Sequence, residues 1–96
     1  MGNPATKFVR AYDRGIITLH EAAYKIVSEA VEHSVAELAA ELPAQFLAEL
    51  ALIAQHGISR IDPIAFAHVR EGELGPRVAH METGIANWRA WFAEQE

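Results

Sequence analysis

Apolar residues recur every three or four positions along most of this chain, and this spacing most restricts its fold. A period near 3.6 places such residues on one side of an α-helix, whereas a half-buried strand needs strict alternation. The clearest sets are Leu19, Ala22, Ala23, Ile26, Val27 and Ala30; Phe46, Leu47, Leu50, Ala51 and Ala54; and Val78, Met81, Ile85, Trp88 and Phe92. The pattern predicts an all-α fold.

Capping residues indicate where the helices begin and end. Asn3-Pro4 is typical of an N-cap followed by proline in the first turn. Thr18 and Glu21 match the capping box, in which two side chains satisfy free backbone N–H groups. Glycines at positions 15 and 57 can supply the left-handed residue that ends a helix. The predicted helices span about 4–13, 19–42, 43–56 and 76–94, the last beginning at Pro76 after a loop at 71–75.

Residues 31–42 allow two interpretations. A second capping box at Ser34 and Glu37 would end one helix and begin another at Val35. Alternatively, one helix continues to residue 42, because the apolar stripe is uninterrupted. Nothing in residues 32–35 forces a break, so we favour the continuous helix.

Two further features leave alternatives open. Residues 63–70 follow a cap-then-proline pair at Asp62-Pro63, which favours a short helix, although residues 64–69 also alternate as a strand would. A lone strand would have no partner, so we favour the helix. Gly84 lies inside the last predicted helix at a cost of about 1 kcal/mol relative to alanine. It predicts either a kink or a close approach of a neighbouring backbone.

The length of the chain limits its architecture. A chain of 96 residues forms one domain, so we expect a single helical domain over residues 1–96. Such a chain buries roughly 60–65% of the surface that it exposes when unfolded. That suffices for one core without a large enclosed cavity. We therefore predict a compact bundle of four to five helices.

Charge and composition limit the kinds of molecule that this chain is expected to bind. The chain has a formal net charge of −5, with six glutamates against Lys25 over residues 21–59. This acidic middle disfavours nucleic acid and anionic lipid and suits a basic protein. The absence of cysteine excludes disulfides and thiolate chemistry. No signal-like segment and no apolar run of roughly 20 residues is present, so we expect a soluble, cytoplasmic protein.

The second predicted helix carries residue types that bind divalent metals. If that helix is continuous, Glu29, His33 and Glu37 lie at positions i, i+4 and i+8 on one face. Carboxylates and imidazole are ligands that divalent metals accept. A solvated acidic face with one incidental histidine explains the same spacing more simply. We therefore predict no metal ligand and no cofactor.

Catalytic and nucleic-acid motifs are also weak. The sequence holds neither a glycine-rich phosphate loop nor a Gly-x-Ser-x-Gly elbow, so we predict no catalytic residue and no enzyme. Residues 54–59 resemble the turn of a helix-turn-helix. Ile53 occupies the position where that pattern has a small residue, and Pro63 would fall early in the recognition helix. Nucleic-acid binding is therefore not favoured.

The cluster Asn87 to Phe92 concentrates the aromatic residues near the C-terminus. Trp88 and Phe92 belong to the apolar stripe and are predicted core residues. Trp91 widens that stripe and belongs either to the core or to an interface, since tryptophan and arginine are enriched at binding hot spots.

Together these features favour a non-catalytic protein-binding module, such as a small regulator or inhibitor. Its predicted contacts to a basic partner are an acidic helix face and a C-terminal aromatic patch, comprising Glu29, Glu37, Glu41, Arg89 and Trp91. Two alternatives remain. One is a homo-oligomer assembled through the last helix, and the other is a weak metal- or DNA-binding domain.

Overall fold

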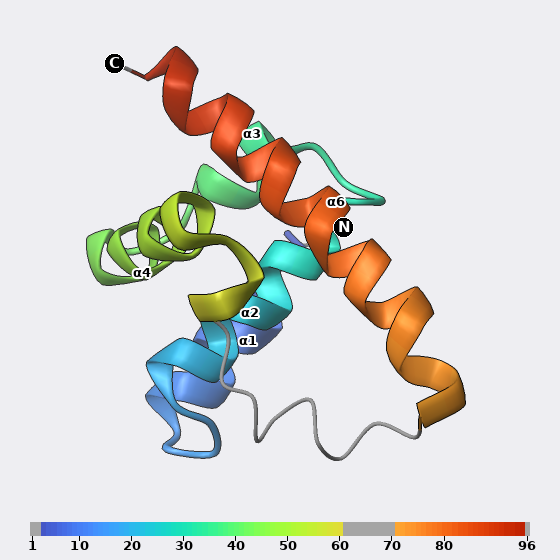
Figure 1. Ribbon diagram of the computed structural model, residues 1–96. Coiled ribbons are helices and arrows are strands. Elements are labelled where there is room, and N and C mark those ends of the chain that lie inside the picture. The colour runs from blue at the N-terminus through green and yellow to red at the C-terminus, as the bar shows by residue number, and fades with distance from the viewer. Residues whose placement is uncertain (1–2, 61–70, 96) are drawn as a thin grey trace.

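The longest helix, α6 (Glu71–Glu94), crosses the other elements in the computed structural model and contacts α2, α3, α4 and η1 (Figure 1). The structure describes residues 3–60 and 71–95, and only the backbone of residues 71–78. Within these ranges every regular element is helical, which confirms the predicted all-α bundle. The other elements are α1 (Thr6–Asp13), α2 (Leu19–Glu29), α3 (Val35–Ala39), α4 (Ala44–His56) and the 3-10 helix η1 (Gly57–Arg60).

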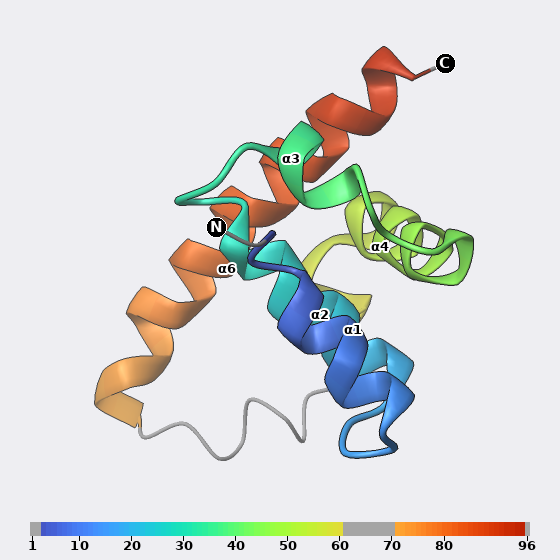
Figure 2. The same ribbon diagram turned by 180° about the vertical axis from the view of Figure 1, so that it is seen from behind.

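The corner between α1 and α2 forms as its residues predict. The N–H groups of Gly15 and Ile16 bond to the carbonyls of Tyr12 and Ala11, and Gly15 has φ +74°. This is the Schellman arrangement, in which a left-handed glycine satisfies the last carbonyls of a helix. The predicted Asn3 cap is wrong, because α1 begins at Thr6 with Ala5 as its N-cap and no side-chain cap bond. Asn3 Oδ1 instead accepts from Ala5 N–H at 2.9 Å, in a turn that precedes the helix. In Figure 2, α1 packs beside α2 in the resulting hairpin.

The two predicted capping boxes differ, and this difference gives a stability test. Glu21 N–H bonds to Thr18 Oγ1 at 3.0 Å, whereas Ser34 makes no side-chain cap bond. We expect Thr18→Ala to lower the free energy of unfolding by about 1 kcal/mol, the usual value of an N-cap. The matched change Ser34→Ala should leave it nearly unchanged. Urea denaturation of both variants measures the difference, and equal losses would contradict the cap assignment.

The predicted continuous helix over residues 19–42 is wrong. α2 ends at Glu29, and the N–H groups of residues 30–32 bond back three residues in tightened turns. The chain resumes at Val35 as α3, so the alternative with a restart at that residue is correct. A continuous helix would carry Leu38 roughly 12 Å beyond Ala30, at 1.5 Å per residue. The break instead brings Leu38 back into the core, where its side chain is fully buried.

Side chains of α6 cap the ends of two other helices. Asn87 Nδ2 donates to Ala30 O at 3.0 Å, at the end of α2. Arg89 Nε donates to Ala54 O at 2.8 Å, near the end of α4. These bonds satisfy carbonyls that the ends of α2 and α4 leave without helical partners. These bonds between distant residues explain the end of α2 better than any residue near position 30 does.

Gly84 lies where α6 and α2 approach closely. Of the two predicted alternatives, a kink or a close approach of a neighbouring backbone, the second is therefore present. A Cβ atom built at Gly84 would overlap the carbonyl oxygen of Val27 and lie 3.0 Å from its carbonyl carbon. Only glycine lets the two backbones approach this closely. The crossing point of α2 and α6 is therefore fixed by residues 27 and 84.

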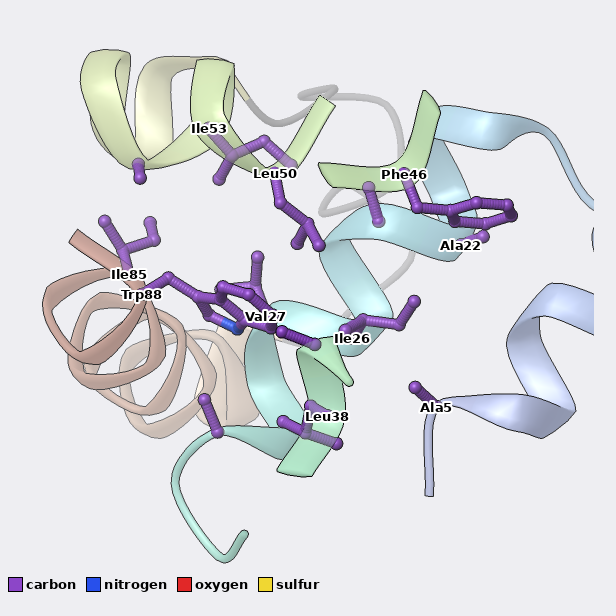
Figure 3. Close-up of a cluster of buried hydrophobic side chains, with 14 of the residues drawn as sticks. Ala5, Ala22, Ile26, Val27, Leu38, Phe46, Leu50, Ile53, Ile85 and Trp88 are labelled. Carbon is purple, nitrogen blue, oxygen red and sulfur yellow. The ribbon is translucent and has the colours of Figure 1, made fainter. Parts of the chain in front are cut away.

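Trp88 occupies the centre of the core, as predicted. Its side chain is fully buried, and Figure 3 shows it between α2 and α4. The largest fully buried side chains come from four helices and comprise Ile26, Val27, Leu38, Phe46, Leu50, Ile53 and Trp88. Burial of such side chains is the main force that holds helices of this length together.

The start of the last helix was also predicted wrongly. α6 begins at Glu71, five residues before Pro76, so residues 71–75 are helical and not a loop. Glutamate and leucine at positions 71, 73 and 74 favour helix, but Gly72, Gly75 and Pro76 oppose it more strongly, so local propensity does not explain this extension. The predicted helix over 63–70 lies outside the described residues. Within the described part of the chain, none of the helices combines the length and the apolar character that a bilayer crossing requires.

Candidate functional site

The acidic residues predicted to share one helix face come from three separate segments. Glu29 ends α2, Glu37 lies in α3, and Glu41 follows α3 in the turn before α4. Glu29 is half-buried and lies 3.6 Å from His33 Nε2 and 4.0 Å from Lys7 Nζ. Its charge is therefore largely engaged within the protein. Glu37 and Glu41 are exposed, and no ion pair links either of them to the rest of the described chain.

Glu37 and Glu41 each border the start of α1. The backbone carbonyl of Glu37 accepts a hydrogen bond from Asn3 Nδ2 at 2.7 Å, which ties α3 to the start of α1. Glu41 contributes to a small pocket of about 100 Å³ at the same place. The pocket is lined mainly by apolar atoms, from Asn3, Ala5, Thr6, Val9, Glu41 and Leu42. We refer to Glu37, Glu41 and this pocket as the α1–α3 face.

The predicted C-terminal patch divides into two parts. Arg89 and Trp91 are two residues apart on a helix, which rotates their side chains by roughly 200° from one another. Arg89 reaches the end of α4, whereas the ring of Trp91 packs against those of Trp88 and Phe92 at centroid distances of 5.8 and 5.1 Å. Trp91 is half-buried against the core. This packing supports the interpretation that most of the Trp91 side chain belongs to the core.

Arg89 also borders a wider groove between α4 and α6. This groove has a volume of about 600 Å³ and is lined by Ala51, Ala54, Gln55, Arg89, Phe92, Ala93 and Gln95. Arg89 itself is exposed, and it forms no ion pair with any of the acidic residues that the structure describes. We refer to this feature as the α4–α6 groove.

A polar cluster that sequence reasoning missed joins α2, α4 and η1. His20 Nδ1 lies 2.8 Å from Glu49 Oε2, and Arg60 donates to both oxygens of Glu49 at 3.2 and 3.3 Å. An imidazole held by a carboxylate is a geometry used in general-base catalysis. Here Arg60 engages both carboxylate oxygens, so the cluster is better explained as a cross-link between three elements. Its members are 11 and 29 residues apart, which no local pattern reveals.

The same cluster predicts how stability changes with pH. Burial raises the pKa of Glu49, but hydrogen bonds from His20 and Arg60 and their charges outweigh it and hold the pKa below its ordinary value. The folded protein therefore gains stability from ionised Glu49 above the carboxyl's ordinary pKa, and loses it as pH falls through the lowered one. We expect Glu49→Gln to flatten the fall in the free energy of unfolding between neutral and acid pH. Urea denaturation across that range measures the slope, and an unchanged slope would contradict the pairing.

The metal arrangement considered above does not form. The break after α2 removes the continuous face, and only Glu29 and His33 remain adjacent. Among the described residues, no three histidine or acidic side chains converge so as to hold a metal ion. The helix-turn-helix interpretation is not tested, because its recognition helix would fall on residues 61–70, outside the described ranges.

Comparison of this chain with protein-family models, with curated proteins and with solved structures finds no match.

Proposed function

We propose that this protein is a non-catalytic protein-binding module of the cytoplasm that engages a basic segment of a partner through the α1–α3 face. The observation that carries the proposal is an exposed, unpaired carboxylate, Glu41, in the lining of a small apolar pocket, with exposed Glu37 on the adjoining α3, whose carbonyl bonds to Asn3 of the same pocket. Such an arrangement suits lysine or arginine. Their aliphatic stems pack against apolar surface, and their charged ends form ion pairs with carboxylates. The net charge of −5 adds long-range attraction for the same partner.

The rigidity of the α1–α3 face supports the proposal. Asn3 bonds to the carbonyls of Glu37 and Leu38, and through its Oδ1 atom to Ala5 N–H. One side chain thus holds the first turn of α1 and the short helix α3 together. A surface that is already ordered loses less conformational entropy when a partner binds. Trp91 adds a half-buried aromatic surface. A partner large enough to extend from the α1–α3 face to α6 would make its second contact there.

Charge reversal of the α1–α3 face tests this proposal with a defined probe. Octalysine supplies the basic groups and aliphatic stems that the face should recognise. We expect the double change Glu37→Lys and Glu41→Lys to weaken octalysine binding about tenfold or more at low salt, because attraction becomes repulsion. Isothermal titration calorimetry measures the dissociation constant, and added salt should weaken binding to the unaltered protein.

The control changes the net charge by the same amount at other exposed sites. Asp13→Lys and Glu94→Lys together match the double variant in charge, and both residues are exposed at the C-terminal ends of their helices. Octalysine binding should fall much less in this control. An equal loss in both proteins would show that only net charge matters and would overturn the α1–α3 face as the binding site.

A further inference from the structure

The α4–α6 groove has an electrostatic character opposite to that of the whole molecule. Its described lining carries one charged side chain, Arg89, in a chain with a net charge of −5. Nε of Arg89 donates to Ala54 O, and this exposed residue has no acidic partner among the residues described. The groove therefore suits an occupant that brings a carboxylate together with small apolar side chains.

A second copy of this chain supplies such an occupant. Glu82 is exposed on α6, seven residues before Arg89, and has no described ion partner. Seven residues make almost two full turns, so Glu82 and Arg89 project from the same side of the helix. If two α6 helices lie antiparallel about a two-fold axis, each Glu82 meets the other copy's Arg89. The two-fold axis repeats this contact, so the dimer contains two Glu82–Arg89 ion pairs.

The shape of the groove fits the same arrangement. The two-fold axis would pass near Ala86, an exposed residue midway between the two charges. Ala79 of each copy would then lie against Phe92 and Ala93 in the other copy's groove, since these positions are equally distant from the axis. Small side chains at positions 79, 86 and 93 allow the helices to approach closely. Ala79, Glu82, Ala86 and Arg89 are all exposed, so this side of α6 is open to a second copy.

We propose that the α4–α6 groove is a homodimer interface in which the α6 turn Ala79–Glu82 of a second copy seats antiparallel, with Glu82 of each copy paired to Arg89 of the other. This interface is separate from the α1–α3 face, so it does not depend on binding of a basic partner there. Its small side chains bury little area, and the dimer belongs to the weak, concentration-dependent class.

Two single charge reversals, mixed together, test the pairing. Glu82→Arg gives a chain with arginine at both positions, and Arg89→Glu gives one with glutamate at both. Each alone places like charges opposite one another and should raise the dimer dissociation constant about tenfold or more. Their equimolar mixture restores two opposite-charge pairs and should recover the dimer. Sedimentation equilibrium across a dilution series measures all four samples, including the unaltered protein.

A second pair of variants covers the case in which Arg89→Glu disturbs the end of α4. Ala86→Glu places two carboxylates at the proposed axis and should yield a monomer, whereas Ala36→Glu, at an exposed position on α3 outside the groove, should dimerise like the unaltered protein. The proposal is overturned by an unaltered protein that stays monomeric throughout, or by a dimer that is indifferent to Glu82→Arg and Ala86→Glu. A mixture of folded charge variants that fails to dimerise would also overturn it.

Discussion

Replacing Trp88 with alanine is expected to have the largest effect of any single change in the described core, lowering the free energy of unfolding by about 3–5 kcal/mol. The side chain is fully buried between α2 and α4 and is the largest of the fully buried side chains, so its removal would leave the largest cavity. A domain of this size has a free energy of unfolding of roughly 5–15 kcal/mol, so the change would remove a large fraction of it. Urea denaturation followed by far-UV circular dichroism measures the loss.

Two matched changes show whether the loss comes from the buried volume at this site. Trp88 Nε1 is buried without a hydrogen-bond partner among the described residues, so Trp88→Phe removes an unsatisfied donor together with part of the ring. We expect it to cost far less than Trp88→Ala. Trp91→Ala removes the same side chain from a half-buried site and should also cost less. An equal loss at Trp88 and Trp91 would contradict the burial assigned to them.

Gly84→Ala is expected to destabilise the protein by about 1–3 kcal/mol, although helix propensity alone predicts a gain of about 1 kcal/mol. The added Cβ would overlap the carbonyl of Val27, a backbone group that cannot move aside without shifting α2 or α6. The sign of the change in the free energy of unfolding therefore distinguishes two cases. A loss indicates that glycine is required by the close approach of α2 and α6, and a gain indicates that glycine is only tolerated there.

The control for Gly84 lies two residues away on the same helix. Ala86 is exposed, and Ala86→Gly should follow propensity and lose about 1 kcal/mol. Thermal denaturation at low protein concentration compares the two variants without a contribution from dimerisation. A Gly84→Ala protein more stable than the original would show that α2 and α6 do not meet as described.

Local signals predicted much of this fold because they act within one or two turns. The apolar stripe and the Thr18 cap gave the start of α2, and the glycine at position 15 gave the end of α1. The end of α2 was predicted wrongly because its cause is distant in sequence. Asn87 bonds to Ala30 from 57 residues away, and no pattern near residue 30 indicates that bond.

The candidate sites show the same limit more strongly. The sequence identifies Glu37 and Glu41 as acidic residues, but the pocket beside Glu41 depends on how Asn3 joins α1 to α3. Arg89 was selected for its place beside two tryptophans, whereas its contact is with the end of α4. A one-dimensional pattern identifies which residues are amphipathic or charged, and tertiary packing decides which of them meet.

The measurement that tests the central functional claim most directly is a proton–nitrogen NMR titration of the protein with octalysine. We expect the amide signals that shift first and furthest to belong to the first turn of α1 and to residues 37–42, and added salt to reverse these shifts. Shifts spread evenly over all exposed acidic residues, or the absence of any shift at low salt, would contradict a basic-partner site at the α1–α3 face.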